Sequence, residues 1–249
     1  MRARLLALLL LLAAAPAHAQ PREPLPPLTA ELSTRIVEIS TGFTGASVLV
    51  FGATDRVIGD GDDVLVVAWG PPQPIVVRRK INVLGFWING PAAWFPEVPG
   101  FYAITGTRPA WQILPEEVRQ QARLGLDNLS LRAIGRQAPA FRAALLALKQ
   151  EERRWQEDAE PIAVSAGRVF HARIHFPDTV QTGDYRIEVL LVRDRQVVAR
   201  QFLGLRVERT GTAARIATVA RETPLLYGIA CVLLAALAGW LGSVLFRRS

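Results

Sequence analysis

The sequence is poor in the residues that most often carry chemistry, with one cysteine, one methionine and three histidines among 249 residues. The cysteine, Cys231, lies inside a long apolar run near the C-terminus. The chain before that run therefore has neither an internal disulfide nor a thiol nucleophile, and its fold depends on packing alone. Half of the residues are hydrophobic, which excludes a disordered chain and leaves room for one or two folded units.

Motifs of known catalytic and cofactor sites are also lacking. The chain has no Gly-x-Ser-x-Gly nucleophile turn, no phosphate-binding glycine loop, no Cys-x-x-Cys pair and no carboxylate pair whose spacing indicates glycosidase chemistry. We therefore assign no catalytic residue, no cofactor and no metal ligand from the sequence. We expect a protein that is not an enzyme.

The N-terminal residues have the build of a secretory signal. Two arginines precede an apolar run over residues 5–15, and the small-x-small triplet Ala17-His18-Ala19 follows. A run of 11 apolar residues is too short to cross about 30 Å of hydrocarbon as a helix. We expect residues 1–19 to be a cleaved signal peptide and residues 20–27, which are rich in proline, to form an extended lead.

The C-terminal residues predict a membrane helix over residues 224–246. Leu225 to Phe246 are 22 residues without a charge, and at 1.5 Å per residue they span about 33 Å. Two arginines begin the tail at residues 247–249, which favours a cytoplasmic C-terminus. Together with the signal peptide, this helix predicts a single-pass protein of the inner membrane whose bulk lies in the periplasm.

The net charge of +7 must be divided among these segments. Removing the four arginines at the two ends leaves 25 basic against 22 acidic residues, a net charge of +3 for the exported part. This near balance gives no support for nucleic-acid binding, and an exported location argues against it.

Short runs with strand periodicity lie on both sides of a helical segment. They predict a mainly β fold of the immunoglobulin-like β-sandwich type, with strand-rich parts at 28–110 and 159–208 around a helical pair at 111–158 and a linker at 209–223. The expected strands are 33–39, 46–51, 63–69, 75–81, 169–176, 185–192 and 197–207, the last two forming a hairpin.

Two finer expectations concern the middle of the chain. A further strand pair is expected between Phe86 and Thr105, separated by a turn at Asn89-Gly90-Pro91. Helices are expected from Pro115 to about residue 129 and from Pro139 to about residue 155, packed as an antiparallel pair.

Several short motifs, in their order and spacing, resemble those of the alphaproteobacterial putative transmembrane protein family. The resemblance covers almost the whole chain and implies an exported β-rich domain on one C-terminal helix, with no reaction and no catalytic residues to carry over. The motifs are Phe43-Thr44-Gly45-Ala46, Phe51-Gly52-Ala53, Gly85-Phe86-Trp87-Ile88-Asn89, Pro99-Gly100-Phe101-Tyr102, the Phe141 to Lys149 helix, Pro224-Leu225-Leu226-Tyr227-Gly228 and Gly239-Trp240.

Aromatic residues are concentrated in one segment, with seven of the 19 between Phe86 and Trp111. Core packing explains part of this concentration. A partly exposed edge around Trp87, Trp94 and Phe95 is the second interpretation, with a partner protein or the outer leaflet as its target. The nearby cations at 78–80 fit either the protection of an edge strand or contact with lipid phosphates.

The expected membrane helix carries small side chains at every fourth position. Cys231, Ala235, Gly239 and Ser243 form this small-residue strip, which would let a second helix approach closely. The strip predicts association with another membrane protein or with a second copy, although small residues are frequent in any membrane helix.

Two groups of polar residues offer weaker candidate sites. In a strand, His171 and His175 lie about 13 Å apart, too far to share a metal, so a polar outer face is the simpler interpretation. The acidic loop Asp60 to Asp63, with Asp55 before it, fits a turn between strands or, less simply, a cation site.

Three hypotheses for function follow from these patterns. The favoured one is a non-enzymatic accessory subunit of a membrane transporter or envelope complex. The second is a periplasmic enzyme or ligand-binding domain with its site around His171, His175 and the Asp60 to Asp63 loop. The third is a binder of envelope polymer or lipid through the aromatic segment.

Overall fold

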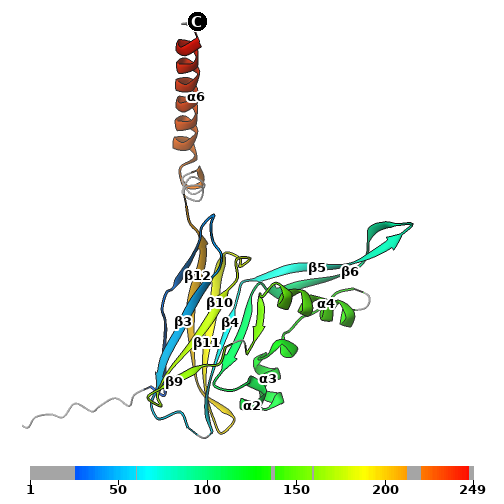
Figure 1. Ribbon diagram of the computed structural model, residues 1–249, viewed down its shortest axis with the longest axis vertical. Helices are drawn as coiled ribbons and strands as arrows, with labels where there is room; N and C mark the ends of the chain where they lie inside the picture. Colours follow the sequence, from blue (N-terminus) through cyan, green and yellow to red (C-terminus); the bar gives the residue numbers. More distant parts are fainter. Residues whose placement is uncertain (1–25, 60, 136–137, 159, 212–219, 247–249) are drawn as a thin grey trace, which may run out of the picture.

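A computed structural model describes residues 26–59, 61–135, 138–158, 160–211 and 220–246 (Figure 1). The expected signal peptide, most of the proline-rich lead and the tail at 247–249 lie outside the described residues. The described part is mainly β, with a helical insertion and one C-terminal apolar helix, as the sequence predicts.

Two β-sheets face each other and enclose a hydrophobic core. Sheet A has the strand order β1-β3-β10-β9, formed by β1 (Leu28–Leu32), β3 (Ala46–Thr54), β10 (Val169–Phe176) and β9 (Ala163–Ser165). Sheet B has the order β2-β12-β11-β4-β7-β8, formed by β2 (Ile36–Ile39), β12 (Gln196–Arg209), β11 (Gly183–Arg193), β4 (Asp62–Trp69), β7 (Tyr102–Gly106) and β8 (Trp155–Glu157).

The strands before and after the helical insertion form one sandwich. In sheet A, β3 pairs antiparallel with β10, and in sheet B, β4 pairs antiparallel with β11. The expected hairpin of β11 and β12 is confirmed, with Asp194 and Arg195 at positive φ in its turn. The pairs β2–β12 and β7–β8 are parallel.

The central strands of sheet B are covered on both faces, which explains their unbroken apolar sequences. In β4, Val64 and Val66 contact the core between the two sheets, which we call the sandwich core. The alternate residues Leu65 and Val67 contact a second core on the opposite face of sheet B, which we call the helical-side core. Strand β11 is divided in the same way, so sheet B is the middle layer of three.

The helical insertion supplies the third layer. It contains α2 (Ala110–Ile113), α3 (Glu116–Ala122), the 3₁₀ turn η1 (Leu126–Asn128) and α4 (Ala138–Glu151). The expected first helix is shorter than predicted, because Arg123 adopts a left-handed conformation and ends α3. The most extensive contacts of α4 are with β5, β6 and β8 rather than with α3, so the expected antiparallel helix pair is wrong.

A long hairpin of β5 (Pro72–Val83) and β6 (Phe86–Pro99) projects beyond the sandwich, with α4 lying along its base (Figure 1). We call this hairpin the arm. Its turn is Leu84-Gly85, and β6 runs without interruption through Asn89-Gly90-Pro91, where a turn was expected. The pairing register shifts between Arg78 and Lys80, opposite this segment, so the glycine and proline are accommodated in an irregular stretch of the hairpin.

The C-terminal helix α6 (Pro224–Phe246) extends away from the β-rich part (Figure 1). Its Pro224–Leu241 segment has the length and composition needed to cross a membrane, and none of that segment is buried. Because an apolar helix of this length is unstable in water without a cover, its side chains indicate a lipid environment.

Candidate functional site

The turn at the tip of the arm has an unusual residue for its conformation. Leu84 and Gly85 have φ values of 53° and 88°, as a two-residue hairpin turn with positive φ at both positions requires. The Asn82 Oδ1 atom accepts a hydrogen bond from the Gly85 backbone N–H at 2.9 Å. Glycine and asparagine are favoured in such turns, whereas Leu84 is bulky and 94% exposed. A side chain so placed contributes nothing to the cores of the chain itself.

The strands next to this turn present an apolar face to solvent. Val83 pairs with Phe86, and Ile81 pairs with Ile88, so these four side chains share one face of the hairpin. Phe86 is 74% exposed, and Val83 and Ile88 are also exposed. Trp87, opposite Asn82, lies on the other face and is 68% exposed. We call Val83, Leu84, Phe86, Trp87 and Ile88 together the apolar tip.

The three aromatic residues predicted to form a recognition edge separate in the structure. Trp87 belongs to the apolar tip. Trp94 lies at the base of the arm, is 46% exposed and exchanges backbone hydrogen bonds with Ile134 at 2.9 and 2.8 Å. Phe95 is fully buried in the helical-side core, so its assignment to an exposed surface is wrong. Strand alternation explains the difference, because neighbouring residues point to opposite faces.

Basic residues lie just behind the apolar tip. Arg78, Arg79 and Lys80 are exposed, and the Arg79 guanidinium lies 5.9 Å from the centre of the Phe141 ring on α4. The sequence from Pro71 to Pro96 contains these three cations and no acidic residue. The arm is therefore a positively charged projection with an apolar end.

The small-residue strip occupies one side of α6. At about 100° per residue, Cys231, Ala235, Gly239 and Ser243 fall within an arc of about 120°. Among the described residues, a Cβ atom added at Gly239 would meet no atom within 4 Å beyond its chain neighbours and the backbone of its own helix. These four residues are uncovered by the rest of the described protein.

The two histidines lie on β10, on the outer face of sheet A. The His175 Nδ1 atom is 2.8 Å from the Ser47 hydroxyl, and its Nε2 atom is 3.2 Å from a Glu160 carboxylate oxygen. His171 is half-buried and pairs across the sheet with Phe51 on β3. The inward residues of β10 alternate with these polar ones, which confirms the interpretation as a polar outer face. Among the described residues, no group of three acidic, histidine or cysteine side chains is arranged to hold a metal ion.

One arginine of the loop and one from a distant strand neutralise Asp55 and Asp62, in the loop after β3. Asp55 pairs with Arg193, and Asp62 lies within 4 Å of both Arg56 and Arg193. The hydrogen bond from Arg193 holds the pKa of Asp55 below its usual range. These pairings occupy carboxylate oxygens that a cation would need.

Asp63 is held in the same manner, and Asp60 lies outside the described residues. The buried Asp63 carboxylate accepts hydrogen bonds from the Thr107 hydroxyl at 2.7 Å and from the Arg108 guanidinium. Two cavities border His175, of ≈ 1000 Å³ and ≈ 10 Å³, and neither includes Asp62 or Asp63. The predicted ligand site around the histidines and the acidic loop is therefore not brought together in these cavities.

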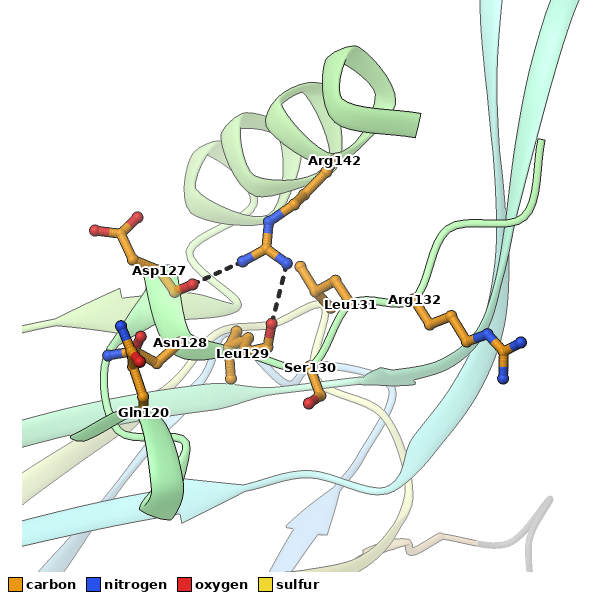
Figure 2. Close-up of a pocket in the computed structure, with 8 residues that line it drawn as sticks. All are labelled: Gln120, Asp127, Asn128, Leu129, Ser130, Leu131, Arg132 and Arg142. Atoms are coloured by element: carbon orange, nitrogen blue, oxygen red, sulfur yellow. Dashed lines mark hydrogen bonds between the residues drawn. The ribbon is translucent and has the colours of Figure 1, made fainter. Parts of the chain in front are cut away.

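A hollow of ≈ 430 Å³ beside α4 is lined mainly by polar residues, among them Arg142 (Figure 2). The Arg142 guanidinium reaches from α4 across the hollow and donates hydrogen bonds to the backbone carbonyls of Asp127 at 2.7 Å and Leu129 at 3.2 Å. These bonds join α4 to the segment around η1. The Arg142 cation is therefore engaged in supporting the fold.

A larger cavity of ≈ 800 Å³ lies between the base of the arm, the end of β4, β11 and the helical insertion. Trp69 lines it, and the Trp69 Nε1 atom is buried without a hydrogen-bond partner among the described residues. Glu188, which also lines it, pairs with Arg200 at 3.2 Å. Sequence reasoning missed this cavity, because the arm base, β4 and β11 are brought together only by the tertiary fold.

An uncovered apolar helix that is long enough to cross a bilayer, and that follows a β-rich domain, defines a membrane protein with one candidate C-terminal helix. The comparison with known families agrees with this class. The model of the family described as "Putative transmembrane protein (Alph_Pro_TM)" matches residues 27–248, and the chain belongs to this family. The resemblance seen in the sequence motifs is thereby confirmed. A comparison with curated proteins gives no match.

Proposed function

We propose that this chain is a non-enzymatic accessory or interaction subunit of a membrane transporter or envelope complex. Its immunoglobulin-like β-sandwich lies in the periplasm, α6 crosses the inner membrane once, and the short basic tail lies in the cytoplasm. The signal-like N-terminus and the arginines after α6 support this orientation.

The observation that carries the proposal is the uncovered small-residue strip of α6. In a bilayer, helices associate through close packing and not through the hydrophobic effect, because lipid tails are as apolar as leucine. A strip of Cys231, Ala235, Gly239 and Ser243 permits close approach of a second backbone along about three turns of the helix. Large apolar side chains such as Leu233, by contrast, cover the other side.

The polar residues support an interaction role over catalysis. The carboxylates of Asp55, Asp62 and Asp63 are engaged with arginines, and both ring nitrogens of His175 lie within hydrogen-bonding distance of neighbouring side chains. These pairs stabilise junctions between strands and loops. In contrast, α6 and the apolar tip each expose several large apolar side chains.

Mild-detergent co-purification of the tagged full-length chain from its native membranes tests the proposal. Gly239→Leu should abolish recovery of a stoichiometric membrane partner, because a leucine on the strip prevents close helix approach. The substitution should leave the β-rich domain intact, because a Cβ at this position meets none of the described residues outside its own helix.

Ala230→Leu is the matched control. It adds a leucine about 160° around the helix from the centre of the strip, and it should retain the partner. If Gly239→Leu retained every complex that the wild-type chain forms, or if both variants lost it equally, association through the strip would be refuted. A wild-type chain recovered alone and monomeric would refute the accessory role.

A further inference from the structure

We propose that the apolar tip of the arm inserts into the headgroup region of the membrane that α6 crosses, with anionic phospholipids as its ligand. The inference concerns a different surface from the strip on α6. It requires only that α6 spans a membrane, and it is independent of any protein partner.

The conformation of the arm gives the first reason. A two-stranded hairpin exposed on both faces is marginally stable in water, and three or more strands or a packed face are usually required. The part of the arm from residue 79 to residue 91, which we call the distal arm, nevertheless places Ile81, Val83, Phe86 and Ile88 together on one face, and all of them but the half-buried Ile81 are exposed. An apolar surrounding at this end would remove that face from water.

The distribution of side chains along the arm matches a lipid interface. Leu84 and Phe86 lie at the end, where they would be deepest. Lys80 is four residues behind Leu84, which corresponds to about 13 Å along an extended strand. Peripheral elements bury their apolar side about 5–10 Å into the interface, so the basic residues at 78–80 would lie among the phosphates. Trp87, which is exposed between these levels, is a residue type enriched at membrane interfaces.

Charge favours anionic lipid over a neutral surface. The segment from Pro71 to Pro96 carries three cations and no acidic residue. Each cation near an anionic membrane surface favours binding by about fivefold. The arm as a whole, which includes Glu97, carries a net charge of +2, so its three cations outnumber its one acidic residue.

The position of the arm makes the contact sterically reasonable. In Figure 1 the tip lies level with the end of the sandwich from which β12 leads toward α6. Fourteen residues separate Arg209, the last residue of β12, from Pro224, which limits the distance between them to about 50 Å. The membrane anchor therefore keeps this end of the domain within about 50 Å of the start of α6, and the tip of the arm lies at the same end of the domain.

Depth-dependent quenching in proteoliposomes tests the proposal on the full-length chain. Cys231→Ala removes the one native thiol, and Leu84→Cys then carries an environment-sensitive fluorophore. Val198→Cys, exposed near the β11–β12 turn, is the control position. With phosphatidylglycerol present, the label at position 84 should shift its emission to the blue and be quenched by lipids spin-labelled near the headgroup. The label at position 198 should show neither effect.

Charge variants complete the test. Arg78→Gln and Lys80→Gln should each reduce the ratio of quenched to unquenched label about fivefold, and vesicles of phosphatidylcholine alone should give little quenching. Position 86, labelled through Phe86→Cys, should repeat the result if the label at 84 disturbs the turn. The proposal is overturned if the labels at 84 and 198 respond equally in both lipids. It is also overturned if the label at 84 is shielded only at high protein density, which indicates a second copy, or only in native membranes, which indicates a protein partner.

Discussion

Removing the distal arm should leave the stability of the protein almost unchanged. The change replaces residues 79–91 by Asn-Gly, so that a two-residue turn links Arg78 to Ala92, its partner across the hairpin. Among the described residues, no side chain from 79 to 91 belongs to the sandwich core or the helical-side core. The contact of Arg79 with the Phe141 ring would be lost, which is worth about 0.5–1 kcal/mol. We therefore expect a loss of at most about 1 kcal/mol.

Equilibrium unfolding of the full-length chain by urea in detergent micelles, followed by tryptophan fluorescence, measures this loss. Trp155 is buried in the helical-side core and reports its opening. Phe95→Ala is the control at the base of the same arm. Because Phe95 is fully buried, its truncation should cost about 3–5 kcal/mol. If excision of the distal arm cost as much as Phe95→Ala, the arm would be part of the folded core, and the argument for an external ligand would fail.

Two further predictions concern single side chains. Tyr102→Phe should lower the free energy of unfolding by about 1–3 kcal/mol. The buried Tyr102 hydroxyl accepts a hydrogen bond from the Gly125 backbone N–H at 2.9 Å, and the substitution leaves that N–H unpaired. An unchanged thermal midpoint would contradict this prediction. Asp55→Asn tests the pKa of Asp55, which Arg193 holds below its usual range. The pair should stabilise the folded state by at most about 1 kcal/mol, because it is partly exposed. This stabilisation should be present above about pH 4 and disappear as the pH falls through the lowered pKa. Urea midpoints of wild type and variant across this range should converge at low pH.

Periodicity was sufficient to predict the elements that depend on local pattern. The alternation in β10 and the uncharged run of α6 are both present as expected. Each pattern follows from the environment of the element, because a strand with one buried face alternates and a helix exposed to lipid is apolar throughout. Alternation also indicated that Trp94 and Phe95 lie on opposite faces of the strand, so the two residues could not both belong to one exposed surface. Grouping the aromatic residues by closeness in sequence concealed that signal.

Features that depend on distant parts of the chain were not predictable from local pattern. Asn89-Gly90 is among the strongest hairpin signals, but the turn forms at Leu84-Gly85, because the pairing of β5 with β6 continues through a register shift. The acidic residues next to β4 acquire partners such as Arg108 and Arg193 only when the strands assemble. Their spacing in sequence carries no information about these arginines.

The order of the strands in the two sheets has a consequence for how the domain folds during synthesis. Val50 of β3 pairs with Ala172 of β10, 122 residues later, and Leu65 of β4 pairs with Leu190 of β11, 125 residues later. Pairings between such distant segments make folding slow, because loop closure must precede the contacts that reward it. The first half of the domain cannot complete either sheet until β10 and β11 have emerged, and little chain then remains before α6. The domain therefore acquires its native structure only when the polypeptide is almost finished, at about the time that its anchor reaches the bilayer.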